Sequence, residues 1–399
     1  MQLTEKHIVR MGHPLYKECD RLCFSSKNIY NRAMYLIKQD YTENKAYNVL
    51  KNLYNVMKTE ECYKMLPPKV AVQTLRSVAS IWRSFFALMK SKTQRHVGEP
   101  RYLHKANGRF VTTFTNQAVS KKVYTKSHKV KLSQCDIEFY TKVESFDRIH
   151  CVRIVPCLDS YSIEVVHEVD DVEVLEPNGT YFSIDLGVDN LATVTSNMRS
   201  SVPFVVNGKP LKSANQYYNK RLAHYKSKLS RNGRKTSHRV RRLTNKRNRK
   251  VNDYLHKASA LIVKRMLSED ARCLVVGKND GWKQESNIGK PNNQNFVNIP
   301  HSRFVDMLRY KCERAGISFR TVEESYTSKC SFLDGESVKR HDSYMGSRVK
   351  RGLFKSSDGR LINADVNGSY NILRKAVPNA FANGIEGVVV HPLIITIRN

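Results

Sequence analysis

The most informative acidic residue of the chain lies inside an apolar run. Asp185 stands in the segment FSIDLG, between Ile184 and Leu186, and this segment has the composition of a core strand. A carboxylate among such neighbours is costly unless it forms an ion pair or binds a metal ion. Gly187 follows two residues later and permits a tight turn with a close backbone approach. Asp185 is therefore a candidate metal ligand at the end of a strand.

A second candidate acid is Asp365, in RLINADVNGSYNILRKA, where a helix begins. On its own, an Asp at this place is more often a helix N-cap. Together with Asp185 it indicates phosphodiester hydrolysis, which needs carboxylates from separate elements to hold two divalent cations about 4 Å apart. Oxygen ligands favour Mg²⁺ or Mn²⁺ over zinc. A third carboxylate is expected at the end of the fourth strand, LVVGKN, but Gly277 or Lys278 stands there.

The charge of the chain indicates a polyanionic partner. Its 399 residues include 68 Lys+Arg and 36 Asp+Glu, a formal net charge of +32. This excess argues against an ordinary metabolic enzyme and favours nucleic acid, with an anionic membrane surface a distant second. No acid occurs between Asp189 and Asp253. Because unbalanced like charges on a helix repel, this stretch favours phosphate binding, and its nucleic-acid-binding candidates are Lys220, Arg221, Lys228, Arg234, Arg239, Arg242, Arg247 and Lys250.

The alternative interpretation of this stretch is a basic tail or a localisation signal. Against it, apolar residues recur at helical spacing, among them Leu222, Leu243 and Leu255. Such a stripe is typical of a helix that packs on a sheet. The stretch therefore predicts nucleic-acid binding but no reading of a base sequence.

The rest of the composition indicates the class of protein and its cellular compartment. With 40% hydrophobic residues the chain can bury sizeable cores, and roughly 150 residues per domain suggests two or three domains. The start MQLTEKHIVR lacks the apolar core of a signal peptide, and no apolar run approaches the roughly 20 residues that span a bilayer. Nine scattered cysteines without a C-x-x-C indicate reduced thiols. We therefore expect a cytoplasmic protein that is not associated with a membrane.

The first half of the chain predicts a small β-barrel with a helical insertion. Residues 2–10 alternate as one strand, and apolar residues have helical spacing over 16–57 and 69–93, on either side of Pro67–Pro68. Between residues 108 and 169 four segments have strand patterns: RFVTTFTNQAV, KVYTKSHKVKL, RIHCVRIVPCL and YSIEVVHEV.

The second half predicts an α/β domain. TYFSIDLGVDNLATVTS gives two strands, and a third follows near residues 203–206. Basic helix from 214 to 268, the strand LVVGK, a helix over 301–316, the strand ISFRTVEE and a last helix over 365–377 complete it. Three strands, helix, strand, helix, strand, helix is the order of a ribonuclease H-like domain. The predicted fold class is thus α/β plus a β-barrel.

Several motifs resemble the TnpB family of transposon-associated, RNA-guided nucleases, which is similar to the RuvC-containing type V CRISPR effectors and the Fanzor proteins. The resemblance covers essentially the whole chain and is most specific from Asp185 to Pro392. It rests on SIDLGVDNLATV, LVVGKNDGWKQ, PHSRFVDMLRYKCERAGI, YTSKCSFLDGE, and DGRLINADVNGSYNILRKA followed by GIEGVVVHP.

This resemblance implies a domain division. It places a wedge β-barrel at residues 1–12 and 97–175 and a helical recognition insert at 13–96. A RuvC domain with a ribonuclease H-like fold would occupy 176–399. That domain would include basic helices at 214–268 and a degenerate zinc-ribbon-like loop at 327–364.

The resemblance also implies a replacement for the missing acid. In some family members the glutamate is carried by the strand before the Thr-Ser motif, which here reads VEESYTSK and offers Glu323 and Glu324. Alternation puts the two on opposite faces, so only one can be a ligand. Glu324 is the expected third catalytic residue beside Asp185 and Asp365. Alternatively both glutamates are surface acids and the site is inactive; Asp280 is a poorer substitute.

No zinc site is expected. Many family members carry four cysteines between the Thr-Ser motif and the last acid, whereas residues 327–364 contain only Cys330. Asp334, Glu336, His341 and Asp342 are near it in the sequence. One thiolate cannot complete a closed structural zinc site.

The function implied is a transposon-encoded, Mg²⁺- or Mn²⁺-dependent DNA endonuclease directed by a guide RNA from the element's end. Its partners would be that RNA and double-stranded target DNA, of which the protein reads only a short adjacent motif. Candidates for this reading, because their side chains can bond base edges, are Gln73, Arg76, Thr115 and Asn116.

Two other functions remain open at this stage. The missing strand-four glutamate would fit a nuclease-inactive, RNA-guided repressor of DNA. A general RNA-binding structural protein would explain the charge but not the placed acids. The oligomeric state is not defined by the sequence.

Overall fold

The computed structural model describes most of the chain, in the ranges 1–44, 51–91, 97–278 and 299–397. Two compact units divide it at residue 170: Met1–Asp170 and Asp171–Asn399. In the described ranges no helix is long and apolar enough to cross a membrane.

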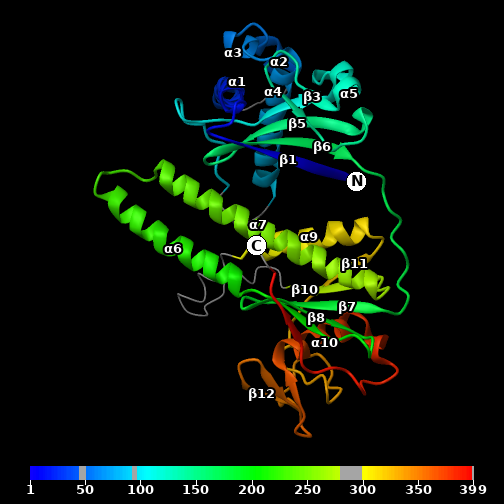
Figure 1. The fold of residues 1–399 in the computed structure, drawn as a ribbon. Helices are drawn as coiled ribbons and strands as arrows, with labels where there is room; N and C mark the ends of the chain where they lie inside the picture. The colour runs from blue at the N-terminus through cyan, green and yellow to red at the C-terminus, as the bar shows by residue number, and fades with distance from the viewer. Residues whose placement is uncertain (45–50, 92–96, 279–298, 398–399) are drawn as a thin grey trace. The chain divides into compact units, whose positions relative to one another are not determined.

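The helices of the first unit follow the sequence pattern. They are α1 (Tyr16–Asn44), α2 (Lys51–Met57), α3 (Glu61–Lys64) and α4 (Pro68–Lys90) (Figure 1). Pro67 caps α4 and Pro68 is its first residue, where the missing N–H of proline costs nothing. The apolar side of α4 centres on Trp82, which is fully buried and donates its indole N–H to the sulfur of Met34. The predicted helical spacing and the proline break are confirmed.

The same unit contains a four-stranded antiparallel sheet in the order β1-β6-β5-β2. Its strands are β1 (Gln2–Arg10), β6 (Ser160–Glu168), β5 (Ile149–Pro156) and β2 (Thr112–Thr115), with short 3₁₀ turns η1 (Asn116–Ala118) and η2 (Phe146–Arg148). A separate ladder joins β3 (Lys129–Lys131) to β4 (Glu138–Tyr140). A closed barrel is not shown, because β1 and β2 are the two ends of the strand order.

The predicted strand KVYTKSHKVKL is wrong over most of its length. Residues Lys121–Ser127 form the helix α5. The hydroxyl of Ser120 accepts a hydrogen bond from the N–H of Val123, and His128 ends the helix with φ +55°. This capping stabilises the helix, and the alternating pattern of the segment does not reveal it.

The second unit is built on a six-stranded sheet in the order β11-β10-β7-β8-β9-β15. Strands β7, β10 and β11 are parallel, and β8 is antiparallel to both β7 and β9. The chain passes through β7, β8, β9, a helical hairpin, β10, a helix, β11 and a last helix, which is the predicted order of three strands, helix, strand, helix, strand, helix. The bounds of the six strands are β7 (Tyr181–Leu186), β8 (Asn190–Ser196), β9 (Phe204–Asn207), β10 (Cys273–Gly277), β11 (Ser318–Val322) and β15 (Leu393–Ile395).

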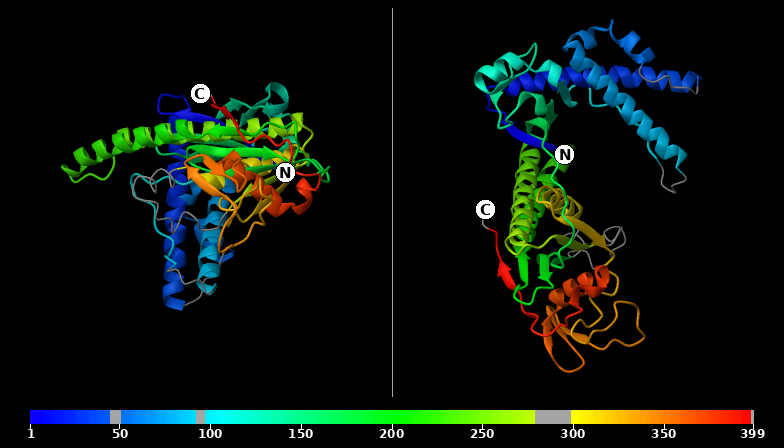
Figure 2. Two further views of the ribbon diagram at one scale, coloured as in Figure 1. Left: turned by 90° about the horizontal axis from the view of Figure 1, so that it is seen from below. Right: turned by 90° about the vertical axis from the view of Figure 1, so that its right-hand side faces the viewer.

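Helices cover both faces of this sheet (Figure 1). α7 (His238–Ser268) and α9 (His301–Arg314) share a core with Phe182 and Ile184 of β7, whereas α10 (Ala364–Ala376) packs on the opposite face. The basic stretch is a hairpin of α6 (Lys209–Ser230) and α7, not one helix, and it projects beyond the sheet (Figure 2). Because α10 opens with Asp365, its face of the sheet is where the candidate acids can meet.

A loop and a small sheet join β11 to α10. Residues 323–346 contain neither helix nor strand and lead into β12 (Ser347–Lys350), β13 (Leu353–Lys355) and β14 (Leu361–Asn363). The buried amide of Asn371, on α10, donates to the carbonyls of Thr327 and Cys330 at 2.8 and 2.7 Å. After α10 the chain passes through a 3₁₀ turn, η3 (Pro378–Phe381).

Replacing Asn371 with Ala should destabilise the second unit, because the carbonyl of Thr327 loses its side-chain donor and that of Cys330 keeps only Asn367. A buried polar group left unpaired costs about 1–3 kcal/mol. Chemical denaturation of the full chain measures this loss. The exposed Asn379→Ala provides the matched control, and equal stability of the two variants would contradict the assigned role.

Candidate active site

Asp185 lies one residue before the end of β7, on the face that α10 covers. Its neighbour on that face, Ser183, forms a buried hydroxyl cluster with Thr195 of β8 and Ser369 of α10, at 2.8 to 3.1 Å. This cluster fixes α10 close to the sheet. A Cβ atom at Gly368 would lie 2.9 Å from the Oδ2 atom of Asp185, so the small residue is required by the close approach.

Asp365 faces the same site from the first turn of α10, and it is not the N-cap of that helix. The cap is Asn363, whose side-chain oxygen accepts hydrogen bonds from the N–H groups of Asp365 and Val366. The Asp365 carboxylate accepts a hydrogen bond from Nδ2 of Asn190, at 2.6 Å, and lies 3.7 Å from the guanidinium of Arg348. The N-cap alternative is therefore wrong, and the carboxylate is available to the site.

The two glutamates after β11 are separated as the alternation predicts. Glu323 is exposed and forms an ion pair with Lys375 at 3.4 Å. Glu324 is half-buried, and its carbonyl accepts hydrogen bonds from the N–H and the hydroxyl of Thr327, which fixes the turn. Tyr326, inside this turn, has φ +66°, a conformation that non-glycine residues seldom adopt. Asp280 lies outside the described residues.

The charges of Asp365 and Glu324 act on Asp185. Burial raises the pKa of Asp185 well above its usual range, and the nearby charges of Asp365 and Glu324 raise it further. Arg348 opposes this shift. Within the described part of the chain Asp185 has no ion-pair partner within 4 Å, whereas Asp365 has Arg348 at 3.7 Å, so a bound cation would favour the ionised form of Asp185.

A cavity of about 200 Å³ opens beside these acids. Arg348 and Arg351, from the β12–β13 hairpin, line it together with Asp185, Asp189 and Asp365. Arg351 and Lys212 both pair with Asp189, and the hydrogen bond from Lys212 lowers the pKa of that carboxyl group. The sequence analysis missed both arginines, because they lie in an exposed hairpin with no spacing signal.

The basic candidates all lie on the α6–α7 hairpin. Six have exposed side chains: Lys220, Lys228, Arg234, Arg239, Arg242 and Lys250. The other two are half-buried. Arg221 donates to the hydroxyl of Tyr225, and Arg247 joins the helices by donating to Asn215 at 2.7 Å. Arg247 thus holds the hairpin together, and the six exposed residues form its cationic surface.

The four candidates for base reading line a single groove in the first unit. Gln73 and Arg76 come from α4, Thr115 ends β2, and Asn116 begins η1. The groove has a volume of about 770 Å³ and is also lined by two tyrosines, Tyr54 and Tyr63, and by Lys69. The fold thus brings Gln73 and Thr115, 42 positions apart in the sequence, to the same groove.

Two family models and one curated relative match parts of the chain. The model for the OrfB_IS605 family, described as probable transposase, matches residues 162–283, and the model for the Cas12f1-like TNB domain matches residues 301–372. A TnpB-like protein, ORF457 of Acidianus two-tailed virus, is 22% identical over 90% of this chain and 83% of its own length.

Among solved structures, a Cas12f1 protein in complex with sgRNA and target DNA covers 93% of this chain and 98% of its own. Its identity is 15% and its TM-score 0.37. The mini-RNA-guided endonuclease Cas-phi3 covers 98% of this chain and 93% of its own, with 10% identity and a TM-score of 0.48.

Strand order and acid placement define the second unit as a mixed α/β domain with a carboxylate cluster on one face. The first family model covers β7, β8, β9 and β10 of that unit, and the second covers α9, β11 and most of α10. The chain is thus similar to the OrfB_IS605 family over residues 162–283, to the Cas12f1-like TNB domain over residues 301–372, and to a TnpB-like protein over most of its length.

Asp185→Asn should stabilise the metal-free protein near neutral pH. The pKa of Asp185 is higher in the folded than in the unfolded chain. The free energy of unfolding is therefore greatest at low pH, and it falls as the pH rises from the unfolded pKa, about 3.9, toward the folded pKa. In thermal unfolding with EDTA, the melting temperature of the variant should exceed that of wild type, and this difference should grow between pH 4 and pH 8.

Asp189→Asn is the matched control of opposite sign. The pKa of Asp189 is lowered by Lys212, so its stabilisation is present above the unfolded pKa and is lost as the pH falls. This variant should be less stable than wild type at pH 7. A loss of stability in both variants would contradict the charge repulsion assigned to Asp185.

Proposed function

We propose that this protein is an RNA-guided DNA endonuclease that hydrolyses phosphodiester bonds at Asp185, Asp365 and Glu324. The observation that carries the proposal is that the carboxylates of Asp365 and Glu324 lie close enough to the buried Asp185 to act on its charge. The three acids come from the end of β7, the start of α10 and the turn after β11. Carboxylates that converge from separate elements, two of them lining a cavity, are what a metal-dependent nuclease requires.

The donor set fits hard divalent cations. All three ligands offer carboxylate oxygens, which suits Mg²⁺ or Mn²⁺. Such a pair of ions supplies an activated water and stabilises the leaving oxygen of the cleaved strand. The residues that would hold them are the same three acids.

Neighbouring side chains orient the acids and prepare the cavity for a phosphate. Asn190 donates a hydrogen bond to Oδ2 of Asp365, and the carboxylate keeps further lone pairs that can bind a metal ion. Arg348 and Arg351 place two guanidinium groups at the cavity wall, where they can bond phosphate oxygens. Lys212, with Arg351, keeps Asp189 paired, so this fourth carboxylate stays outside the acid cluster.

The cationic hairpin supports a nucleic-acid partner for the same unit. Six exposed Lys and Arg side chains along α6 and α7 suit the backbone of a guide RNA or of its duplex with the target. Base pairing would then select the target, and the protein would need only a short motif beside it. The guide RNA and double-stranded target DNA are the proposed partners.

The groove of the first unit is proposed to read that motif. Gln73 and Asn116 carry amides that can bond adenine edges, and Arg76 can bond guanine. Lys69, on the rim, is suited to a phosphate. Tyr54 and Tyr63 provide aromatic surface beside these polar groups.

Glu324→Gln should abolish cleavage, because the amide removes a negative oxygen ligand from the acid cluster. The assay uses the full chain co-expressed with the flanking transposon end, Mg²⁺ and a target library. Losing a member of a catalytic set costs several orders of magnitude in rate. Asp185→Asn and Asp365→Asn should behave likewise.

Glu323→Gln is the adjacent control and should cut at the wild-type rate, since Glu323 only pairs with Lys375 at the surface. Full activity of Glu324→Gln would remove it as the third ligand. Target binding by wild type without any cutting would favour the repressor, the alternative suggested by Gly277 at the end of β10.

Replacement of Gln73 or Asn116 with Ala should change which adjacent motif supports cleavage. One lost bidentate base contact removes about 1–3 kcal/mol of discrimination, measured as relaxed preference at one position of a randomised motif library. Lys69→Ala is the control, because loss of a phosphate contact should weaken all sequences uniformly. Uniform weakening by the Gln73 and Asn116 variants as well would contradict base reading by this groove.

A further inference from the structure

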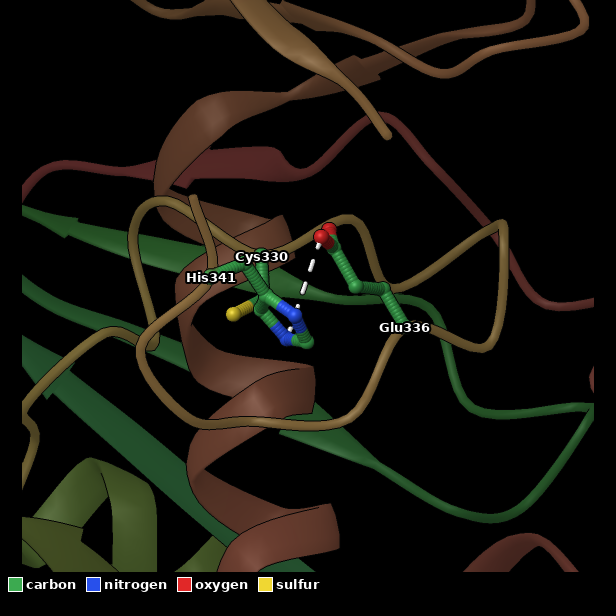
Figure 3. A group of neighbouring side chains, drawn as sticks. All are labelled: Cys330, Glu336 and His341. Carbon is green, nitrogen blue, oxygen red and sulfur yellow. Dashed lines mark ion pairs between the residues drawn. The ribbon is translucent and has the colours of Figure 1, made fainter. Parts of the chain in front are cut away.

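A second cluster of possible ligands lies in the loop between β11 and β12, away from the oxygen-only acid site. Cys330, Glu336 and His341 bring a thiol, a carboxylate and an imidazole together (Figure 3). One ligand atom of each lies within 4.8 Å of the others. Cys330 and Glu336 are buried and His341 is half-buried, in a segment without helix or strand.

The backbone around the cluster is fixed by α10. Asn367 and Asn371 both donate to the carbonyl of Cys330, at 2.9 and 2.7 Å. Asn367 also accepts from the N–H of Phe332, at 2.9 Å. Side chains of a helix thus hold the loop in place, as outer hydrogen bonds do at metal sites.

The carboxylate of Glu336 is oriented by two backbone groups. One oxygen accepts from the N–H of Ser331 at 2.7 Å, and the other from the N–H of Met345 at 3.1 Å. Each oxygen keeps a further lone pair, and one of them lies 4.0 Å from Nε2 of His341. Glu336 is therefore preorganised toward the other two ligands.

We propose that Cys330, Glu336 and His341 bind one transition-metal ion of the Zn²⁺ or Co²⁺ class. Mixed sulfur, nitrogen and oxygen donors select such ions over Mg²⁺. Three protein ligands leave a fourth position to water, so the site is open, unlike a four-cysteine ribbon. The single thiol excludes the closed ribbon, as the sequence indicates, but not this open site, because Glu336 and His341 supply the other two ligands.

Binding would exchange two hydrogen bonds for metal bonds. In the structure the thiol of Cys330 donates to the carbonyl of Lys339 at 3.5 Å, and Nε2 of His341 lies 2.8 Å from the carbonyl of Ser337. The thiol proton would leave to solvent as the thiolate–metal bond forms. The proton on Nε2 would move to the other ring nitrogen through solvent, freeing Nε2 as ligand.

Cobalt titration of the full chain, after removal of metals with a chelator, tests the site. Wild type should bind one Co²⁺ with thiolate-to-cobalt charge-transfer absorption and tetrahedral d–d bands. Excess Mg²⁺ should leave the bands unchanged, whereas Zn²⁺ should remove them. This separates the site from the acid cluster and does not depend on nuclease activity.

Variants assign the ligands. Cys330→Ser should lose the charge-transfer band, and His341→Gln and Glu336→Gln should lose the tetrahedral d–d bands. Cys157→Ser, at an exposed thiol of the first unit, and the exposed His391→Gln are matched controls that should bind as wild type does. If Cys330→Ser fails to fold, the half-buried His341→Gln still decides the outcome. Absence of the bands in wild type, or their persistence in Cys330→Ser or His341→Gln, would overturn the proposal and leave the loop closed by hydrogen bonds alone.

Discussion

Repulsion among three carboxylates is the constraint on which the second unit depends. Asp185, Asp365 and Glu324 are close enough for each charge to oppose the ionisation of Asp185, and burial adds to the same effect. Like charges in a medium of low polarity destabilise the folded chain unless a cation joins them. The fold therefore carries an unfavourable interaction at one place, and this is typical of sites selected for chemistry rather than for stability.

The surrounding structure holds the acids together against this repulsion, because uncharged hydrogen bonds and close packing fix α10 on the sheet. The hydroxyl cluster of Ser183, Thr195 and Ser369 joins β7, β8 and α10 with hydrogen bonds that contain no charge. Gly368 lets the helix approach Asp185 where a larger residue would collide. Since α10 also holds the loop through Asn371, one helix positions an acid of the site and the cluster around Cys330. A disturbance of α10 would thus reach both places.

Much of this site could be predicted because its signals are local. A lone acid in an apolar strand identifies Asp185, and the alternation of a strand separates Glu324 from Glu323. The role of Asp365 could not be decided from the neighbouring sequence, because an acid at the start of a helix can be its N-cap or a metal ligand. In the structure Asn363, two residues earlier, is the N-cap. Arg348 lay beyond prediction, since nothing in an exposed hairpin reports which distant carboxylate it will face. The helix α5 was mispredicted for a similar reason, as alternation was visible and capping was not.

The position of the third acid follows from packing on the α10 face. The residues of β10 that point to this face are Cys273 and Val275, which share a core with Ile372, and then Gly277. A Cβ atom at Gly277 would lie 2.5 Å from Cδ1 of Ile372, so a glutamate at this place would require the Ile372 side chain to move. β11 is the next parallel strand, and Val322 pairs with Gly277 in its register. Glu324 follows two residues after Val322 and is close enough to Asp185 to act on its charge. An acid after the neighbouring strand thus leaves the packing of Ile372 on β10 unchanged.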